Sequence, residues 1–105
     1  MKLDEILSQN NVTLSFEVFP PKATANYEAV KAAAYAVAER RPSYMSVTYG
    51  AGGTTRGNTL EIAKGIQEKY DVTTIAHLTC AGATKESIQQ ALTELKDAGI
   101  ENVLA

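Results

Sequence analysis

Residues 44–53 read YMSVTYGAGG, a strand pattern that runs directly into a glycine-rich turn. Met45 and Val47 share one face of the expected strand, while Ser46 and Thr48 share the other, because side chains alternate along a strand. A helical pattern follows this turn. The same order of strand, turn and helix recurs at intervals of about 30 residues, so the chain is built from repeated β–α units.

The repeat predicts four strands and four helices. The expected strands are Thr13–Phe19, Tyr44–Tyr49, Thr73–Leu78 and Asn102–Ala105. The expected helices are a leading helix at Lys2–Gln9 and three further helices at about Tyr27–Arg40, Thr59–Lys69 and Lys85–Ala98. We expect the leading helix to form a lid on the outside of the barrel, where it docks through its apolar stripe.

Capping residues set the expected ends of these helices. The candidate N-caps are Thr24 or Asn26 for the second helix, Asn58 for the third and Thr84 for the fourth, which ends at Gly99. These signals are local and predict boundaries, not the arrangement of the helices.

Repeated strand–helix–strand units with short turns predict parallel strands in an α/β fold. Two closures are compatible with the pattern, an open doubly wound sheet and a (β/α)8 TIM barrel. A complete barrel needs eight units and roughly 250 residues, whereas this chain carries three to four units in 105 residues. We expect residues 1–105 to be the N-terminal portion of one (β/α)8 domain, truncated in or just after its fourth strand.

Composition excludes several functional classes. The net charge of −2 gives no basic surface for nucleic acid, and no apolar run approaches the length of a membrane span. The first residues lack a secretory signal, and one cysteine cannot form an internal disulfide. We therefore expect a cytoplasmic protein that acts on a small molecule, without nucleic-acid or membrane partners.

Glu17 is the first candidate for chemistry. It lies on the more polar face of the first strand, at the carboxyl end that parallel α/β folds use for ligands, just before Phe19 and the paired prolines. Burial beside aromatic neighbours would disfavour its charged form, so it could serve as an acid near neutral pH. The alternative is a carboxylate paired with a lysine or arginine on a neighbouring strand.

The other candidates lie at the ends of the next two strands. Thr48 is expected to point inward near Glu17, and the turn after it lacks the third glycine of a dinucleotide-binding fingerprint. His77, the single histidine, is expected on the same side, either as a ligand contact or as a hydrogen-bonded structural residue. No zinc site is expected, and we interpret Cys80 as a buried inert thiol. Glu17, Thr48 and His77 thus predict one active site.

The three strand ends resemble successive motifs of the methylenetetrahydrofolate reductase family. The matching segments are SFEVFPPK at 15–22, SVTYGAGG at 46–53 and AHLTC at 76–80, in the family's order and spacing. The resemblance covers the whole chain and about the first third of the family's catalytic barrel.

The resemblance implies a (β/α)8 flavoprotein that uses FAD and NAD(P)H. It would reduce 5,10-methylenetetrahydrofolate to 5-methyltetrahydrofolate, which serves methionine synthesis in one-carbon metabolism. Glu17 resembles the general acid that protonates the folate and opens its imidazolidine ring. Thr48 resembles the residue beside the flavin and nicotinamide, and Tyr49, Ala51 and His77 resemble FAD contacts. A homo-oligomer and no metal are expected.

The family's Arg-Gly-Asp segment after the fourth strand would follow Ala105, together with most FAD and later folate contacts. We therefore expect residues 1–105 alone to be inactive. One alternative is a partial barrel that self-associates through exposed strand edges without binding flavin. Another is a different pterin-handling enzyme that uses the same acid at the strand end.

Overall fold

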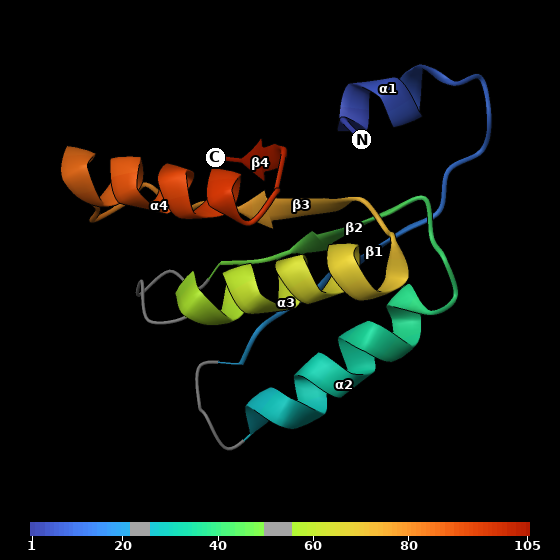
Figure 1. The fold of residues 1–105 in the computed structure, drawn as a ribbon, viewed down its shortest axis with the longest axis horizontal. Coiled ribbons are helices and arrows are strands. Elements are labelled where there is room, and N and C mark those ends of the chain that lie inside the picture. Colours follow the sequence, from blue (N-terminus) through green and yellow to red (C-terminus); the bar gives the residue numbers. More distant parts are fainter. Residues whose placement is uncertain (22–25, 50–55) are drawn as a thin grey trace.

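The computed structural model describes residues 1–21, 26–49 and 56–105, with side chains in the last range described from residue 58. Four strands within these ranges form one parallel sheet in the order β1-β2-β3-β4 (Figure 1). They are β1 (Ser15–Val18), β2 (Tyr44–Val47), β3 (Thr74–His77) and β4 (Asn102–Leu104). All four lie where the sequence predicted strands, and each is slightly shorter than expected.

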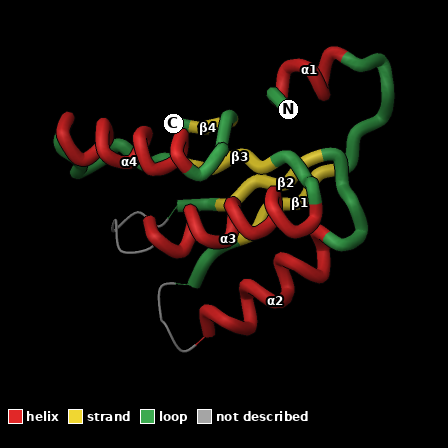
Figure 2. The backbone as a smooth tube through the Cα atoms, viewed as in Figure 1, coloured by secondary structure: helices red, strands yellow, loops and turns green. Residues whose placement is uncertain are grey.

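One helix precedes β1, and further helices separate the successive strands (Figure 2). They are α1 (Leu3–Ser8), α2 (Tyr27–Ala38), α3 (Arg56–Tyr70) and α4 (Lys85–Asp97). Among these described helices, none is both long enough and apolar enough to cross a membrane.

The strand order decides between the two predicted closures. A doubly wound sheet reverses its strand order at a switch point and carries helices on both faces. Here every strand pairs in parallel with the next strand of the sequence, and α2, α3 and α4 contribute to one core. The fold is therefore α/β with successive parallel βα units, consistent with the first part of a (β/α)8 barrel.

The hydrophobic core lies between the helices and one face of the sheet. Met45 and Val47 of β2 and Ala76 of β3 are completely buried. They pack with Ile62 and Ile66 of α3, which are also completely buried. Met45 and Val47 share one face of β2, as the sequence predicted. That face points into the core, and the residue between them lies on the opposite face.

That opposite face, called the inner face here, carries a row of residues that crosses all four strands. The register pairs Glu17 with Ser46, Ser46 with Ile75, and Ile75 with Asn102. Because Ser46 lies between two core residues, the row faces away from the helices. The polar side of β1 therefore lies on the inner face, as predicted.

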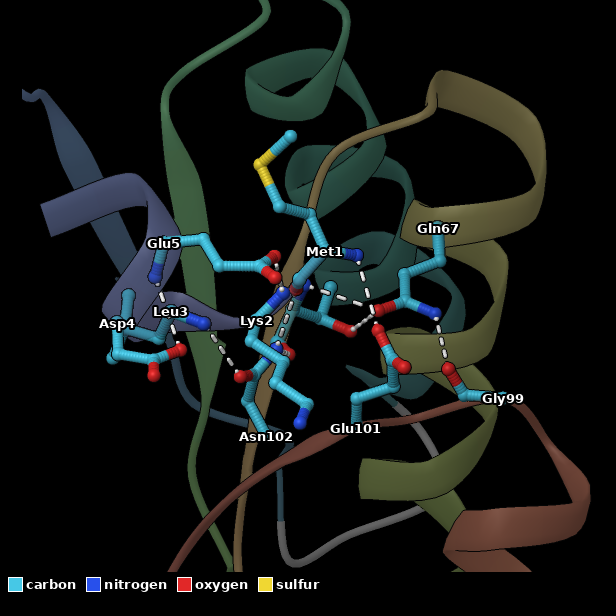
Figure 3. Close-up of polar contacts among 10 residues, drawn as sticks. Met1, Lys2, Leu3, Asp4, Glu5, Gln67, Gly99, Glu101 and Asn102 are labelled. Atoms are coloured by element: carbon cyan, nitrogen blue, oxygen red, sulfur yellow. Dashed lines mark hydrogen bonds and ion pairs between the residues drawn. The ribbon is translucent and has the colours of Figure 1, made fainter. Parts of the chain in front are cut away.

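Helix α1 is held by the beginning of β4 (Figure 3). The Asn102 side chain accepts a hydrogen bond from the Leu3 N–H at 2.8 Å and donates to the Met1 carbonyl at 3.1 Å. It also lies 3.4 Å from the Thr74 carbonyl oxygen in β3. One side chain therefore joins α1, β3 and β4.

The expected position of α1 on the outside of the barrel was wrong. Its buried residue, Ile6, lines a depression with Ser43 and Thr73, which directly precede β2 and β3. Helix α1 thus lies at the amino ends of the strands. An apolar stripe predicts that a helix docks but not the surface that receives it, which explains the error.

The predicted helix ends are partly confirmed. Thr84 caps α4, accepting a hydrogen bond from the Ser87 N–H at 3.1 Å, and Gly99 follows the helix with φ of 76°. Asn26 stands at the N-cap of α2 without a side-chain cap bond, and Thr24 lies outside the described residues. The cap predicted at Asn58 is wrong, since α3 already begins two residues earlier.

Candidate active site

The inner face of the sheet lines an open cavity of about 780 Å³. Glu17, Ser46 and His77 lie in its wall, and Lys2 and Asp4 line it from the side of α1. Small-molecule sites typically measure roughly 300–1,000 Å³, so the cavity has the size of a ligand site.

Glu17 and His77 approach each other closely in this cavity. The His77 Nε2 atom lies 3.4 Å from Oε2 of the Glu17 carboxylate. The predicted convergence of these two residues is therefore present, although they are 60 positions apart in the sequence. Their side chains come from β1 and β3, with β2 between them.

Ser46 fills the position between these two residues. Its hydroxyl donates a hydrogen bond of 2.8 Å to the same oxygen, Oε2 of Glu17. The contact follows from the register, which places Ser46 directly beside Glu17. His77 lies two positions beyond Ile75, the partner of Ser46, so its longer side chain reaches back diagonally to the carboxylate.

The Glu17 side chain is 45% exposed, and His77 is 22% exposed. The enclosure expected around Glu17 is therefore not provided by the described residues. Phe19, the aromatic neighbour that was expected beside the carboxylate, is itself exposed. The acid is thus positioned by polar contacts on an accessible face.

Thr48 follows the end of β2 and is anchored through its backbone. Its N–H donates to the Val18 carbonyl at 3.0 Å, and its own carbonyl accepts from the Thr59 hydroxyl at 2.8 Å. It lies two positions after Ser46, which predicts the same orientation of its side chain. The described lining of the inner-face cavity does not include it, so its place beside a ligand stays a prediction.

Tyr49 and Ala51 differ from the other candidates. Tyr49 lines a small crevice of about 20 Å³ together with Leu60 and Leu95 of the helical layer. This agrees with the expectation that the Tyr49 side chain shares a face with Met45 and Val47. Tyr49 would therefore contact a ligand on the inner face through its backbone. Ala51 lies outside the described residues, and its role stays a prediction.

Cys80 is exposed, which corrects its interpretation as a buried thiol. It follows β3 in the turn that leads to α4, beyond the last residue with a strand partner. The sequence analysis also did not single out Ser46 as a site residue. Its alternation with Thr48 was visible, but the pairing with Glu17 depends on the register between β1 and β2.

Together these features define a class of protein: a parallel β/α protein of the barrel type, with an acid, a hydroxyl and an imidazole facing a ligand-sized cavity. The chain belongs to the methylenetetrahydrofolate reductase family, which matches residues 2–105. The order of the parallel strands agrees with the fold that this resemblance implied.

Individual relatives support the same assignment. The chain is 39% identical over 104 residues to "Methylenetetrahydrofolate reductase (NADH) 1" of Zea mays, covering 99% of the chain and 18% of that protein. It is 33% identical over 104 residues to "5,10-methylenetetrahydrofolate reductase" of Buchnera aphidicola, covering 99% of the chain and 35% of that protein. The chain thus spans between about a fifth and a third of these relatives.

Proposed function

We propose that the protein containing these residues reduces 5,10-methylenetetrahydrofolate to 5-methyltetrahydrofolate, with FAD as cofactor and NAD(P)H as hydride donor. Family membership and the printed names of the relatives support this activity. The observation that carries it is the pair formed by Glu17 and His77, 3.4 Å apart on the inner face. A positioned acid at the ends of parallel strands suits a reaction that requires a proton.

In this proposal Glu17 is the general acid. Its carboxyl group gives a proton to a nitrogen of the imidazolidine ring, which promotes opening of the ring and prepares the folate carbon for reduction. Ser46 holds the carboxylate on one side, and His77 lies against the same oxygen. Because Glu17 is partly exposed, water can return the proton after each turnover.

The residues of the inner face fit a flavin. The cavity is large enough for part of such a ligand, and its wall offers the His77 ring as a polar contact. FAD would be held by Thr48 and His77, by the backbone of Tyr49, and by Ala51. Bound there, FAD would supply hydride transfer between NAD(P)H and the folate.

The Glu17→Gln variant of the full-length protein tests the assignment. We expect folate reduction to be lost while oxidation of NAD(P)H with an artificial acceptor continues, because only the folate step needs the acid. A full-length wild-type protein that is colourless and does not bind FAD would refute the activity. Unchanged folate reduction by the variant would refute the role of Glu17.

A second proposal concerns residues 1–105 produced alone. Strands β1 and β4 form the edges of the described sheet, and the apolar side chains of Phe16, Val103 and Leu104 are exposed there. Unpaired edges with apolar side chains promote pairing with another copy. We expect oligomers without flavin in size-exclusion chromatography and flavin titration, and a flavin-binding monomer would contradict this.

Two further properties of the full-length protein stay predictions. A cytoplasmic location can be tested by cell fractionation, and a homo-oligomeric state by light scattering.

A further inference from the structure

The contact between Ser46 and Glu17 selects one oxygen of the carboxylate. The Ser46 hydroxyl lies 2.8 Å from Oε2, and His77 Nε2 lies 3.4 Å from the same atom. Among the described residues, both polar contacts to the Glu17 carboxylate are therefore made to Oε2. The other oxygen, Oε1, is left for the cavity.

We propose that Ser46 is a positioning residue for Glu17, which holds Oε2 as an acceptor and directs the transferable proton to Oε1. The inference rests on the proposed function, since it assigns a partner to the proposed acid. A hydroxyl that donates to Oε2 favours that atom as the carbonyl oxygen of the acid form, because the carbonyl oxygen of a carboxylic acid is a better hydrogen-bond acceptor than its O–H oxygen. The proton of the acid form is then carried by the oxygen that faces the folate.

The proton balance of this step is simple. The O–H bond at Oε1 breaks, a new N–H bond forms on the imidazolidine nitrogen, and Glu17 is left as a carboxylate. The hydrogen bond from Ser46 strengthens as this negative charge develops, because hydrogen bonds to charged acceptors are stronger than those to neutral ones. Ser46 therefore stabilises the product of proton transfer more than the acid form.

Ser46 is suited to a substitution that leaves the fold intact. It lies on the inner face between Met45 and Val47, whose side chains point into the core, so removal of its hydroxyl leaves the core unchanged. Ser46→Ala deletes the donor, and Ser46→Thr keeps a hydroxyl and favours a strand. Ser8→Ala is a matched control, since the Ser8 hydroxyl donates to the Glu5 carbonyl in α1.

The experiment uses the full-length protein with FAD bound. We expect Ser46→Ala to slow folate reduction about tenfold, the effect of losing one hydrogen bond to a charged group at a partly exposed site. Flavin reduction by NAD(P)H should be unchanged, and Ser46→Thr should restore most of the folate rate. Equal losses in both half-reactions, or no loss in either, would overturn the proposal.

A second measurement separates this inference from the proposed function. The carboxyl carbon of Glu17, observed by ¹³C NMR and assigned with Glu17→Gln, should change its chemical shift in Ser46→Ala but not in Ser8→Ala. An unchanged signal in Ser46→Ala overturns the contact, whatever the activity of the enzyme. If the signal changes but wild-type protein does not reduce the folate, the proposed function fails and the proton assignment fails with it.

Discussion

The phenol ring of Tyr35 in α2 lies directly over Gly65 in α3, so a methyl group added at Gly65 would overlap the Tyr35 hydroxyl. This close approach brings the two helices together at a completely enclosed position, next to the buried Ile66. Glycine is normally unfavourable inside a helix by about 1 kcal/mol relative to alanine. Here the lack of a side chain is required by the neighbouring helix.

Gly65→Ala is therefore expected to destabilise the protein, although alanine favours helix formation. Overpacking of this kind costs about 1–3 kcal/mol, which exceeds the gain in helix propensity. Chemical denaturation of the full-length protein measures the change, with Lys64→Ala on the exposed side of the same helix as control. In a Tyr35→Leu background the cost should disappear, and a cost that persists there would show that Tyr35 is not its cause.

The contact between Lys31 and Glu61 predicts a dependence of stability on pH. The nearby Tyr27 hydroxyl and the Lys31 ammonium, which lies 3.0 Å from Glu61 Oε1, hold the pKa of the Glu61 carboxyl below its ordinary value of 4.5. The folded state then binds fewer protons than the unfolded state between the two pKa values. This contribution to stability is fully present above the unfolded pKa and is lost as pH falls through the folded pKa.

The Lys31→Met variant tests this dependence. We expect it to be less stable than wild type near neutral pH. The difference in stability should narrow as the pH falls through the ordinary Glu pKa of 4.5 and then through the lower folded-state pKa of Glu61, where its carboxylate takes up a proton. Denaturation curves at several pH values measure it. Lys64→Met is the matched control, since its pair with Glu68 is exposed and 3.8 Å long. A difference independent of pH would contradict the assignment.

Asn102 is predicted to hold α1 in place. Asn102→Ala removes the acceptor of the part-buried Leu3 N–H and the donor to the exposed Met1 carbonyl. We expect a loss of about 1–3 kcal/mol in the free energy of unfolding. The Ile6 amide donates a hydrogen bond to the Lys2 carbonyl in α1. In the variant its hydrogen exchange should be faster than in wild type, whereas exchange in α3 should change less. The exposed residue Asn10 provides the control Asn10→Ala, and unchanged protection of α1 would contradict the prediction.

The sequence predicted the parts of this fold that depend on local pattern. Alternation along the strands placed Met45 and Val47 on one face, which the structure shows to be buried, and placed Glu17 on the inner face. Thr84 and Gly99 marked the ends of α4. The choice between a doubly wound sheet and a barrel needed the strand order. That order is a property of tertiary pairing and not of any single segment.

The site was predictable to a similar degree. The approach of Glu17 and His77 followed from their faces and strand ends, and the structure confirms it. The partnership of Ser46 with Glu17 depends on register, because a shift of one residue would turn Ser46 into the core. The exposure of Cys80 and the surface on which α1 docks also depend on how other segments pack around them, which the local sequence does not show.

The bond between the Leu3 N–H and Asn102 joins residues 99 positions apart. During synthesis from the N-terminus, α1 is made first but its acceptor is among the last residues of this segment to appear. Loops that long close late in folding, because their entropic cost is met only after the intervening contacts exist. We therefore expect the bond between α1 and Asn102 to form late in folding, after the pairing of β4 with β3 has brought Asn102 into place.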